Sequence, residues 1–462
     1  MATTTTPDAL ERRNKWTFGI GTIGRDMVYT LVSMFMVFFL SEVLDVSDTV
    51  LLWVSWLVLG ARLFDAVMDV VMGSIVDNTH SRWGHYKPWI LVGVLCSAVF
   101  TVLLFADLGL DDQTFIVVFA VVYLLWGLSW TMNDIPYWAM LPALSVDQKV
   151  RERIGSVAKI FANIGLLVVA VAVIPVTNAL GAAVGLPRAW LLFTAGICVI
   201  MVAGQFVTLF GVKEPHLAAE QQHTSLREVA GVVFKNDQLL WTSIAMVIFM
   251  TGYLTTTTFG TYFFKYAYGD EEMYSPFAAV LIFSQLIAFI TFPMLRKRFN
   301  RRPIFTVSIV LLLVGYLAFF FAPMSILAIG ACGLLLFIGQ GYITMLMLVF
   351  LTDTIDYGHW KLGRRNVGVT FALQPFINKV GAALSTQIVA VTIVAAGISS
   401  AHTPADVTAD GLMLMKVVML IVPAVLILVS YLLYRWKYRI DEQFHARIIA
   451  DLRERGQLQS DG

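Results

Sequence analysis

The chain has 462 residues, of which 58% are hydrophobic and 14% are charged. Soluble globular proteins average about 45–50% apolar and about 25% charged residues, so this composition excludes a chain whose whole surface faces water. The formal net charge of +1 gives no electrostatic reason to expect nucleic acid as a partner. Cys96, Cys198 and Cys332 lie in separate apolar runs, a spacing that favours neither a disulfide framework nor a zinc site.

Long apolar segments follow one another along nearly the whole chain. A helix needs about 20 apolar residues to cross the hydrocarbon core of a bilayer. The first fifteen residues are polar and lack the apolar region of a cleaved signal, so we expect the first segment to stay in the mature protein. Twelve spans are predicted, at 17–44, 49–77, 87–106, 114–142, 156–177, 188–210, 238–267, 275–295, 303–322, 326–355, 367–397 and 411–436. The sequence therefore predicts an all-α integral membrane protein.

A polar stretch divides the predicted spans into two sets of six. The expected organisation is an N-terminal tail, a six-helix bundle, a central loop, a second six-helix bundle and a C-terminal tail, at 1–16, 17–210, 211–237, 238–437 and 438–462. Each half places a basic cluster and a proline between its second and third spans, reading SRWGHYKP and RKRFNRRP. Two repeated six-helix halves are the layout of the major facilitator fold, whose substrate site lies between the halves near the membrane midplane.

Basic and acidic loops alternate between the spans. The loops after the second, fourth, sixth, eighth and tenth spans carry lysine and arginine, whereas the opposite loops carry mainly aspartate and glutamate. Positively charged loops stay on the cytoplasmic side. Both termini and the central loop are therefore predicted to be cytoplasmic, in a multi-pass protein of the cell membrane.

Several charged residues lie inside the predicted spans. A charge at bilayer depth costs from about 2.5 to more than 10 kcal/mol, so each one requires an explanation. The second span carries Arg62, Asp65 and Asp69 at i, i+3 and i+7, which places them on one helical face. The paired acids could coordinate a small cation, share a proton, or simply pair with Arg62 to hold helices together. The first span adds Arg25, a further charge-pairing candidate, and Asp26.

The fourth span contains the sequence DIPYW at 134–138. The Asp134 carboxylate can accept hydrogen bonds from sugar hydroxyls, and the Trp138 indole can pack on the C–H face of a sugar ring. Pro136 distorts a helix, which is tolerated where the segment lines a cavity, although a kinked packing helix would show the same pattern. Lys159 and Lys379 could donate to sugar hydroxyls or form ion pairs across the bundle.

Further charges near the predicted inner membrane surface are candidates for charge pairing and gating. Asp77 could cap the second span or pair with Arg82. Asp353 and Asp356 could pair with cations of the loop between the fourth and fifth spans, which would close the cytoplasmic side in one state. Arg364 belongs to the basic segment that follows these acids. The alternative is plain solvation of all these charges beside the membrane.

Five stretches of the chain form a specific combination. They read GxxGRD at 21–26, ARLFDAVMDVVMGSIVD at 61–77, SRWGHYKPW at 81–89, NDIPYW at 133–138 and DTIDYGHWKLGRR at 353–365. Through them the chain resembles the glycoside–pentoside–hexuronide:cation symporter family over its first eleven spans. The resemblance implies a major facilitator fold, no enzymatic activity, no cofactor, and uphill sugar uptake driven by H⁺, Na⁺ or Li⁺.

The resemblance also implies roles for individual residues. It assigns the coupling cation to three positions in the second and fourth spans, Asp65, Asp69 and Thr131. It assigns the substrate to five positions in the first, fourth, fifth and eleventh spans, Asp26, Asp134, Trp138, Lys159 and Lys379. No metal is implied beyond possible Na⁺ at Asp65 and Asp69. The expected partners are a small sugar or glycoside, the cation and the lipid bilayer, and a monomer is the family default.

Two departures from the family pattern bear on the substrate and the cation. Met68 stands where sodium-coupled members have asparagine, and a thioether is a poor ligand for hard Na⁺, which favours H⁺ as the coupling ion. Lys159 replaces an arginine and lacks its planar bidentate donor, so the sugar or its orientation differs from an α-galactoside. An uncoupled facilitator, a lysolipid carrier of the same family, a scaffold and a metal-dependent membrane enzyme remain as alternatives.

Overall fold

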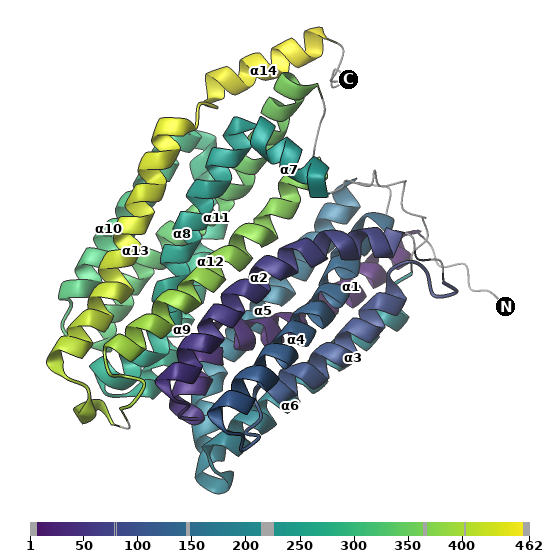
Figure 1. Ribbon diagram of the computed structural model, residues 1–462. Helices are drawn as coiled ribbons and strands as arrows, with labels where there is room; N and C mark the ends of the chain where they lie inside the picture. The colour runs from purple at the N-terminus through teal and green to yellow at the C-terminus, as the bar shows by residue number, and fades with distance from the viewer. Residues whose placement is uncertain are drawn as a thin grey trace. The chain divides into compact units, whose positions relative to one another are not determined.

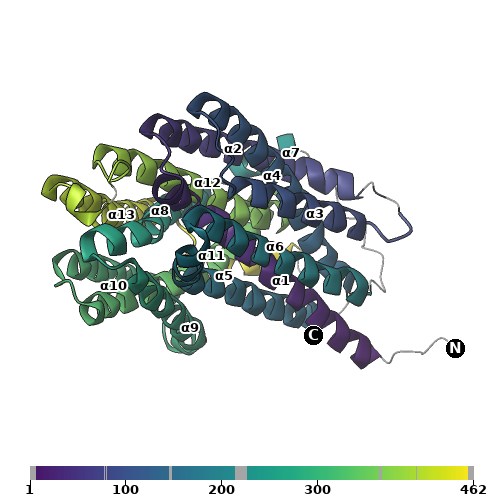
Figure 2. The same cartoon turned by 90° about the horizontal axis from the view of Figure 1, so that it is seen from below.

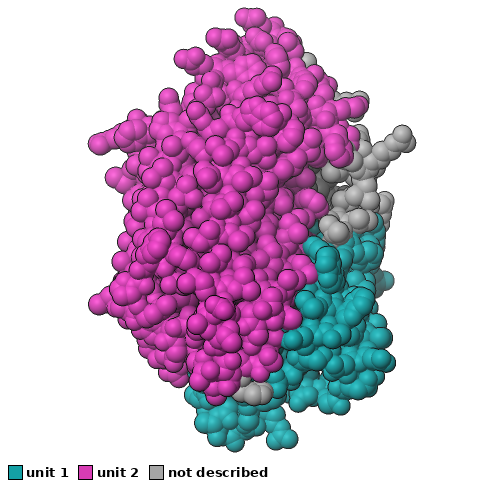
Figure 3. Space-filling view, turned by 60° about the vertical axis from the view of Figure 1, so that its left-hand side comes forward, with its two compact units in different colours: residues 1–223 teal, residues 224–462 magenta. Residues whose placement is uncertain are grey.

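A computed structural model of the chain describes residues 7–77, 79, 81–144, 148–213, 226–363, 367–401 and 403–455 (Figure 1). Within these ranges every regular element is a helix, as the hydropathy pattern predicts. The chain divides into two compact units, residues 1–223 and 224–462, which Figure 3 shows in teal and magenta. The division falls inside the polar stretch between the sixth and seventh predicted spans.

Unit 1 contains six long helices. They are α1 (Pro7–Phe38), α2 (Asp48–Asp77), α3 (Lys87–Leu104), α4 (Asp112–Met140), α5 (Gln148–Val184) and α6 (Leu186–Gly211). Their bounds follow the predicted spans, except that α1 begins ten residues before 17 and that α5 begins and ends several residues beyond 156–177. Asp111 fixes the start of α4, because its carboxylate accepts hydrogen bonds from the backbone and hydroxyl of Thr114, and these bonds lower the pKa of Asp111.

Unit 2 contains six long helices and two short ones. They are α7 (Leu226–Lys235), α8 (Asp237–Tyr262), α9 (Tyr274–Arg298), α10 (Arg301–Phe321), α11 (Ile326–Leu362), α12 (Val367–Ala395), α13 (Ala409–Lys437) and α14 (Glu442–Glu454). The short helices α7 and α14 lie in segments that the hydropathy pattern assigns to the central loop and the C-terminal tail. With 10 and 13 residues, these helices are too short to cross a membrane, so the hydropathy pattern does not indicate them.

Eleven helices of the described chain are long and apolar enough to cross a membrane. The second predicted span corresponds to α2, which has 30 residues but is not among the eleven. This helix carries Arg62, Asp65 and Asp69 along its length. The count of twelve spans and the cytoplasmic location of the termini stay predictions.

Close helix packing holds α1 between α5 and α6 (Figure 2). A Cβ at Gly24 would lie 2.4 Å from the backbone nitrogen of Met201 in α6. Similarly, a Cβ at Gly165 in α5 would lie 2.2 Å from the carbonyl oxygen of Ile23. Small residues let membrane helices approach this closely, because packing rather than the hydrophobic effect holds them together in lipid. The contacts fix the segment of α1 that carries Arg25.

In unit 2 the helix α8 occupies the corresponding place between α12 and α13 (Figure 2). The hydroxyl of Thr256 in α8 donates to the carbonyl of Met419 in α13 at 2.8 Å. Both α1 and α8, the first long helices of their units, continue into a π-helical turn, at Phe39–Val43 and Phe263–Tyr268. This shared feature agrees with the repeat between halves that the loop sequences indicate.

Candidate functional site

Charged and aromatic side chains of unit 1 form two clusters. The first cluster is centred on an ion pair between α1 and α4. The Arg25 guanidinium donates to the Asp134 carboxylate, and the two side chains are 3% and 23% exposed. Three aromatic rings of α4 surround the same guanidinium, with centroids 4.4 Å (Tyr137), 5.6 Å (Trp130) and 5.9 Å (Trp138) from its carbon. Carboxylate and ring faces both stabilise a buried positive charge. We call Arg25, Asp26, Asp134, Trp138 and Lys159 the sugar cluster.

The remaining members of the sugar cluster lie beside this ion pair. Asp26 follows Arg25 in α1, is partly buried, and interacts electrostatically with Arg25, Lys159 and Asp134. The ammonium of Lys159 in α5 lies 4.6 Å from the centre of the Trp138 ring. Unit 1 therefore brings together four of the five predicted substrate residues, with donors, acceptors and an indole face that suit a hydroxyl-rich solute. The fifth, Lys379, is a buried residue of α12 in unit 2.

Contacts with α1 fix the orientation of Trp138. Phe18 stacks on Tyr137 at a centroid distance of 4.5 Å and meets Trp138 edge-on at 6.0 Å. The Tyr137 hydroxyl donates to the backbone carbonyl of Phe18. These contacts hold the end of α4 that contains Pro136, so the indole is ordered before any ligand arrives.

A second cluster lies where α2 meets α4. The Thr131 hydroxyl donates to Oδ1 of Asp69 at 2.9 Å. A Cβ at Gly127 would lie 2.5 Å from Oδ1 of Asp65, so the Asp65 carboxylate packs directly against the α4 backbone. Nη1 of Arg62 lies 3.9 Å from Oδ2 of Asp65. We call Asp65, Asp69 and Thr131 the cation cluster; their oxygen atoms fit either a small cation or a proton.

An aromatic cage that sequence reasoning missed encloses Arg62. Its guanidinium carbon lies 5.6 Å from the Trp126 ring, 5.8 Å from Tyr29 and 5.9 Å from Tyr123. Nε and Nη1 of Arg62 are buried and make no hydrogen bond to any part of the chain that the structure describes. The available signal was the spacing of Tyr123, Trp126 and Trp130 at i, i+3 and i+7 on α4, which marks one helical face.

The predicted gating acids have partners within unit 2. Asp353 pairs with Arg301 of α10 and accepts a hydrogen bond from the Tyr438 hydroxyl at 3.0 Å. Nε2 of His445 in α14 lies 3.1 Å from Asp356 and 3.6 Å from Asp353. These partners were not foreseen from the sequence. The acids thus connect the C-terminal part of α11 to α14.

The other gating candidates add less. The side chain of Asp77 and the whole of Arg364 lie outside the described residues, and Arg82 is exposed in the turn after α2. Arg153, one of the loop cations expected to meet the α11 acids, lies 3.8 Å from Glu11 of α1. A gating role for these residues stays a prediction.

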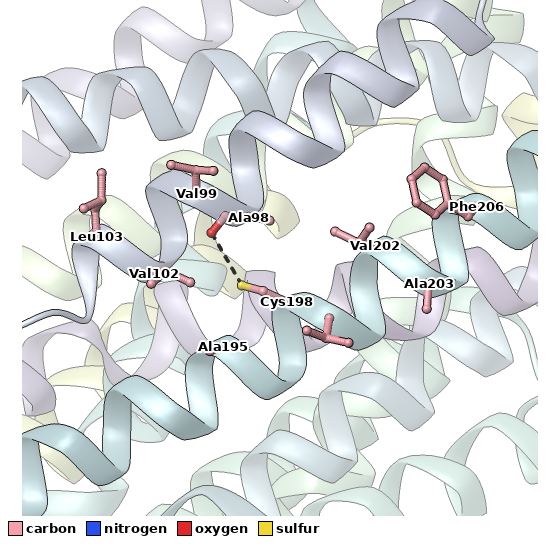
Figure 4. A pocket seen from close by; sticks show the side chains of 10 residues that line it. Ala98, Val99, Val102, Leu103, Ala195, Cys198, Val202, Ala203 and Phe206 are labelled. Carbon is pink, nitrogen blue, oxygen red and sulfur yellow. Dashed lines mark hydrogen bonds between the residues drawn. The ribbon is translucent and has the colours of Figure 1, made fainter.

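An apolar cavity of about 580 Å³ lies between α3 and α6 of unit 1 (Figure 4). Its lining includes Val99, Val102 and Phe206, and the Cys198 sulfur donates to the carbonyl of Ala98 at 3.7 Å. None of its ten lining residues is charged. This cavity offers no group that could hold a hydroxyl-rich solute in place, so the polar clusters are the better candidate site.

The fold and the buried charge clusters define a multi-pass membrane transporter for a small polar solute. Solved structures support the fold: one on substrate recognition in proton dependent oligopeptide transporters matches with a TM-score of 0.66 and 12% identity over 95% of this chain and 100% of the other. The nucleoside transporter NupG matches with a TM-score of 0.63 and 14% identity over 93% and 100%. The family model described as MFS/sugar transport protein matches residues 17–442, and the chain belongs to this family.

Characterised relatives agree with this membership. The chain is 30% identical to a lactose permease of Lactobacillus delbrueckii over 95% of its own length and 72% of the relative's. It is 28% identical to a raffinose carrier protein of Pediococcus pentosaceus over 96% and 72%, and 24% identical to an isoprimeverose transporter of Lactiplantibacillus pentosus over 84% and 81%. The predicted family and the predicted membrane fold are confirmed: the protein is a sugar transporter of the cell membrane and not an enzyme.

Proposed function

We propose that this protein is a cation-coupled symporter that accumulates a glycoside or oligosaccharide in the cell by alternating access, with H⁺ favoured over Na⁺ or Li⁺. One observation carries the proposal. The sugar cluster and the cation cluster share helix α4, where Thr131 and Asp134 stand three residues apart on adjoining turns. A ligand that binds one cluster and shifts α4 would therefore also change the geometry of the other cluster.

The sugar cluster has the chemistry that a glycoside requires. Asp26 and Asp134 supply hydrogen-bond acceptors, Lys159 supplies a donor, and Trp138 supplies an apolar face for the ring. A glycoside that binds here competes with Arg25 for the Asp134 carboxylate. Lactose, raffinose and isoprimeverose, named for the relatives, are all glycosides with many hydroxyls, which makes this class the first to test.

The cation cluster supplies the driving force. Asp65 and Asp69 are two acids on one face of α2, an arrangement in which two carboxylates can share a proton or hold a small cation. A proton or small cation taken up from outside reduces this buried negative charge and allows the loaded carrier to change its open side. Met68 offers a thioether instead of an oxygen ligand, which supports H⁺ rather than Na⁺. Inward movement of one charge gains about 2.3 kcal/mol for each 100 mV of membrane potential.

Uptake into membrane vesicles tests the proposal. Labelled lactose, raffinose, isoprimeverose and a glucuronide are offered under an imposed pH or Na⁺ gradient to the wild type and to Asp65→Cys and Asp69→Cys. We expect accumulation of at least one glycoside under a pH gradient in the wild type, and only downhill flux in both variants. Downhill flux without accumulation in the wild type would show an uncoupled facilitator, and continued accumulation by either variant would remove the assigned role of that acid.

A further inference from the structure

The sugar cluster and the Arg62 cage are joined by two stacked tryptophans. Trp126 and Trp130 of α4 stack with ring centroids 5.7 Å apart and planes 24° from parallel. Arg62 lies over Trp126, and Arg25 lies over Trp130, each at 5.6 Å. Tyr29 of α1 belongs to the same group, because its ring lies 5.5 Å from Trp130 and 5.8 Å from the Arg62 guanidinium.

Each of the two arginines contacts both a carboxylate and the faces of aromatic rings. Arg62 lies between the Asp65 carboxylate, at 3.9 Å, and the three rings of its cage. Arg25 lies between the Asp134 carboxylate and the rings of α4. Ring faces and carboxylates both attract a desolvated guanidinium, so a change in the charge of the acid moves the balance between the two attachments. In the structure each guanidinium makes both kinds of contact at once, and a shift from one contact to the other is the step that coupling between two sites requires.

We propose that Trp126 and Trp130 are positioning residues that couple the cation cluster to the sugar cluster. When a cation neutralises Asp65 and Asp69, Arg62 loses part of its attraction to Asp65 and settles on the Trp126 face. The stacked tryptophans and Tyr29 transmit this shift to Arg25, which then releases Asp134 to the hydroxyls of a sugar. This inference rests on the proposed symport and names the residues through which coupling passes.

Trp126 gives the sharper test because it cannot touch a ligand directly. Its side chain is fully buried, and its indole N–H donates to the Thr101 hydroxyl at 3.0 Å. Trp126→Leu and Trp126→Phe both lose that hydrogen bond, but only the phenylalanine keeps an aromatic face for Arg62. Trp190 of α6 is a matched control, since it is equally buried and stacks on Phe105 in a separate aromatic group.

The measurement is the coupling factor, defined as the ratio of the sugar dissociation constants without and with the bound cation. It is measured on the purified full-length protein with labelled lactose, raffinose and isoprimeverose, at low and high pH and with and without sodium chloride. Coupled sites typically show factors of about 5 to 150. We expect Trp126→Leu to bring the factor within about twofold of one, whereas Trp126→Phe and Trp190→Leu keep most of it.

The outcomes separate this inference from the proposed function. A wild type that accumulates no glycoside in vesicles, or whose sugar binding ignores both ions, overturns the symport proposal and this inference with it. Should none of the three sugars bind, the glycoside that accumulates in vesicles takes their place. A coupled wild type with an equally coupled Trp126→Leu variant overturns the inference alone. Should Trp126→Leu fail to fold, the partly exposed Tyr29 provides a second pair: Tyr29→Leu should lower the factor and Tyr29→Phe should retain it, and equal factors in this pair would also overturn the inference.

Discussion

Several charged side chains in the described part of unit 1 have a hydrogen-bond partner on a different helix. Arg25 pairs with Asp134, and Asp69 accepts a hydrogen bond from Thr131. A charge held in an apolar interior requires such a partner, and the partner determines what the charged group binds next. The hydroxyl of Thr131 is the simplest of these partners to remove without a change of volume.

Thr131→Val should distinguish a proton from a sodium ion as the coupling ion. The variant removes the hydroxyl that donates to Asp69 and keeps the volume of the side chain almost unchanged. For proton coupling, which needs no oxygen ligand from Thr131, the variant should lose no more than about tenfold in sugar uptake, the effect of one hydrogen bond worth up to about 1.5 kcal/mol. For Na⁺ coupling the same variant would lose an oxygen ligand and need more Na⁺. Initial uptake rates measured against pH and against Na⁺ concentration settle the choice, with Thr131→Ser as the control that keeps the hydroxyl.

Some residues of the site could be predicted from the sequence and others could not. Asp65, Asp69 and Asp134 could be singled out because charges are rare in membrane spans, whereas Thr131 followed only from the family resemblance. The Arg62 cage could not, because aromatic residues make up 13% of the chain and a ring that contacts a cation looks in sequence like one that packs in the core. His445 was missed because its contact with Asp356 joins positions 89 residues apart.

The contact between α2 and α4 depends on one glycine. Gly127 leaves space for the Asp65 carboxylate, and no larger side chain fits there without displacing it. Helix α4 therefore carries three features along its length: the support for the cation cluster, the stacked tryptophans and the sugar cluster. The position of α4 relative to α2 therefore determines whether the Asp65 carboxylate stays in contact with the helix that carries the other two features.

Gly127→Ala should weaken cation-dependent uptake more than it weakens folding. The added Cβ would lie 2.5 Å from Oδ1 of Asp65, so the carboxylate must move away from α4. We expect at least a tenfold rise in the ion concentration needed for half-maximal uptake, equal to about 1.4 kcal/mol. Gly73→Ala on α2 is the matched control, because a Cβ there meets nothing within 4 Å. Equal ion dependence in the two variants would show that the close approach does not matter for the site.

Element bounds followed from hydropathy with few exceptions. Long apolar runs ended by polar loops specify where a membrane helix lies, although the structure extends α5 beyond the predicted span at both ends. Helices α7 and α14 were missed because short amphipathic helices depend on capping and on a surface to pack against. Asp441 provides such a cap for α14 by accepting a hydrogen bond from the Phe444 backbone at 2.8 Å.

At the scale of the whole molecule, the C-terminal helix is part of the structure of unit 2. Helix α14 packs on α11 through His445, and the Trp360 indole donates to Asp451 at 2.9 Å. Next to these contacts, Arg302 pairs with Asp441 at 3.5 Å. A segment that composition marks as a polar tail thus holds together the ends of α10 and α11.

Removal of residues 441–462 should destabilise the protein, whereas removal of residues 456–462 should not. The longer truncation deletes His445 and Asp451, and leaves Asp356 and the Trp360 indole without these partners. We expect the melting temperature in detergent to fall by about 2–4 °C for each kcal/mol lost. The shorter truncation keeps all of α14 and serves as the control. Equal melting temperatures for the two truncated proteins would mean that the tail contributes nothing to the stability of unit 2.

The π-helical turns that follow α1 and α8 change which side chains share a face along each of these spans. The backbone N–H of Leu44 donates to the carbonyl of Phe39 five residues earlier, at 3.0 Å. Each turn of this kind holds more residues than an α-helical turn, so the side chains beyond it are out of phase with those before it. A helical wheel that assumes α-helical geometry through the whole of either span would therefore assign Ser41 and Lys265 to a helix face that they do not occupy. Deletion of one residue at either turn would rotate the end of the helix and leave the preceding turns in register.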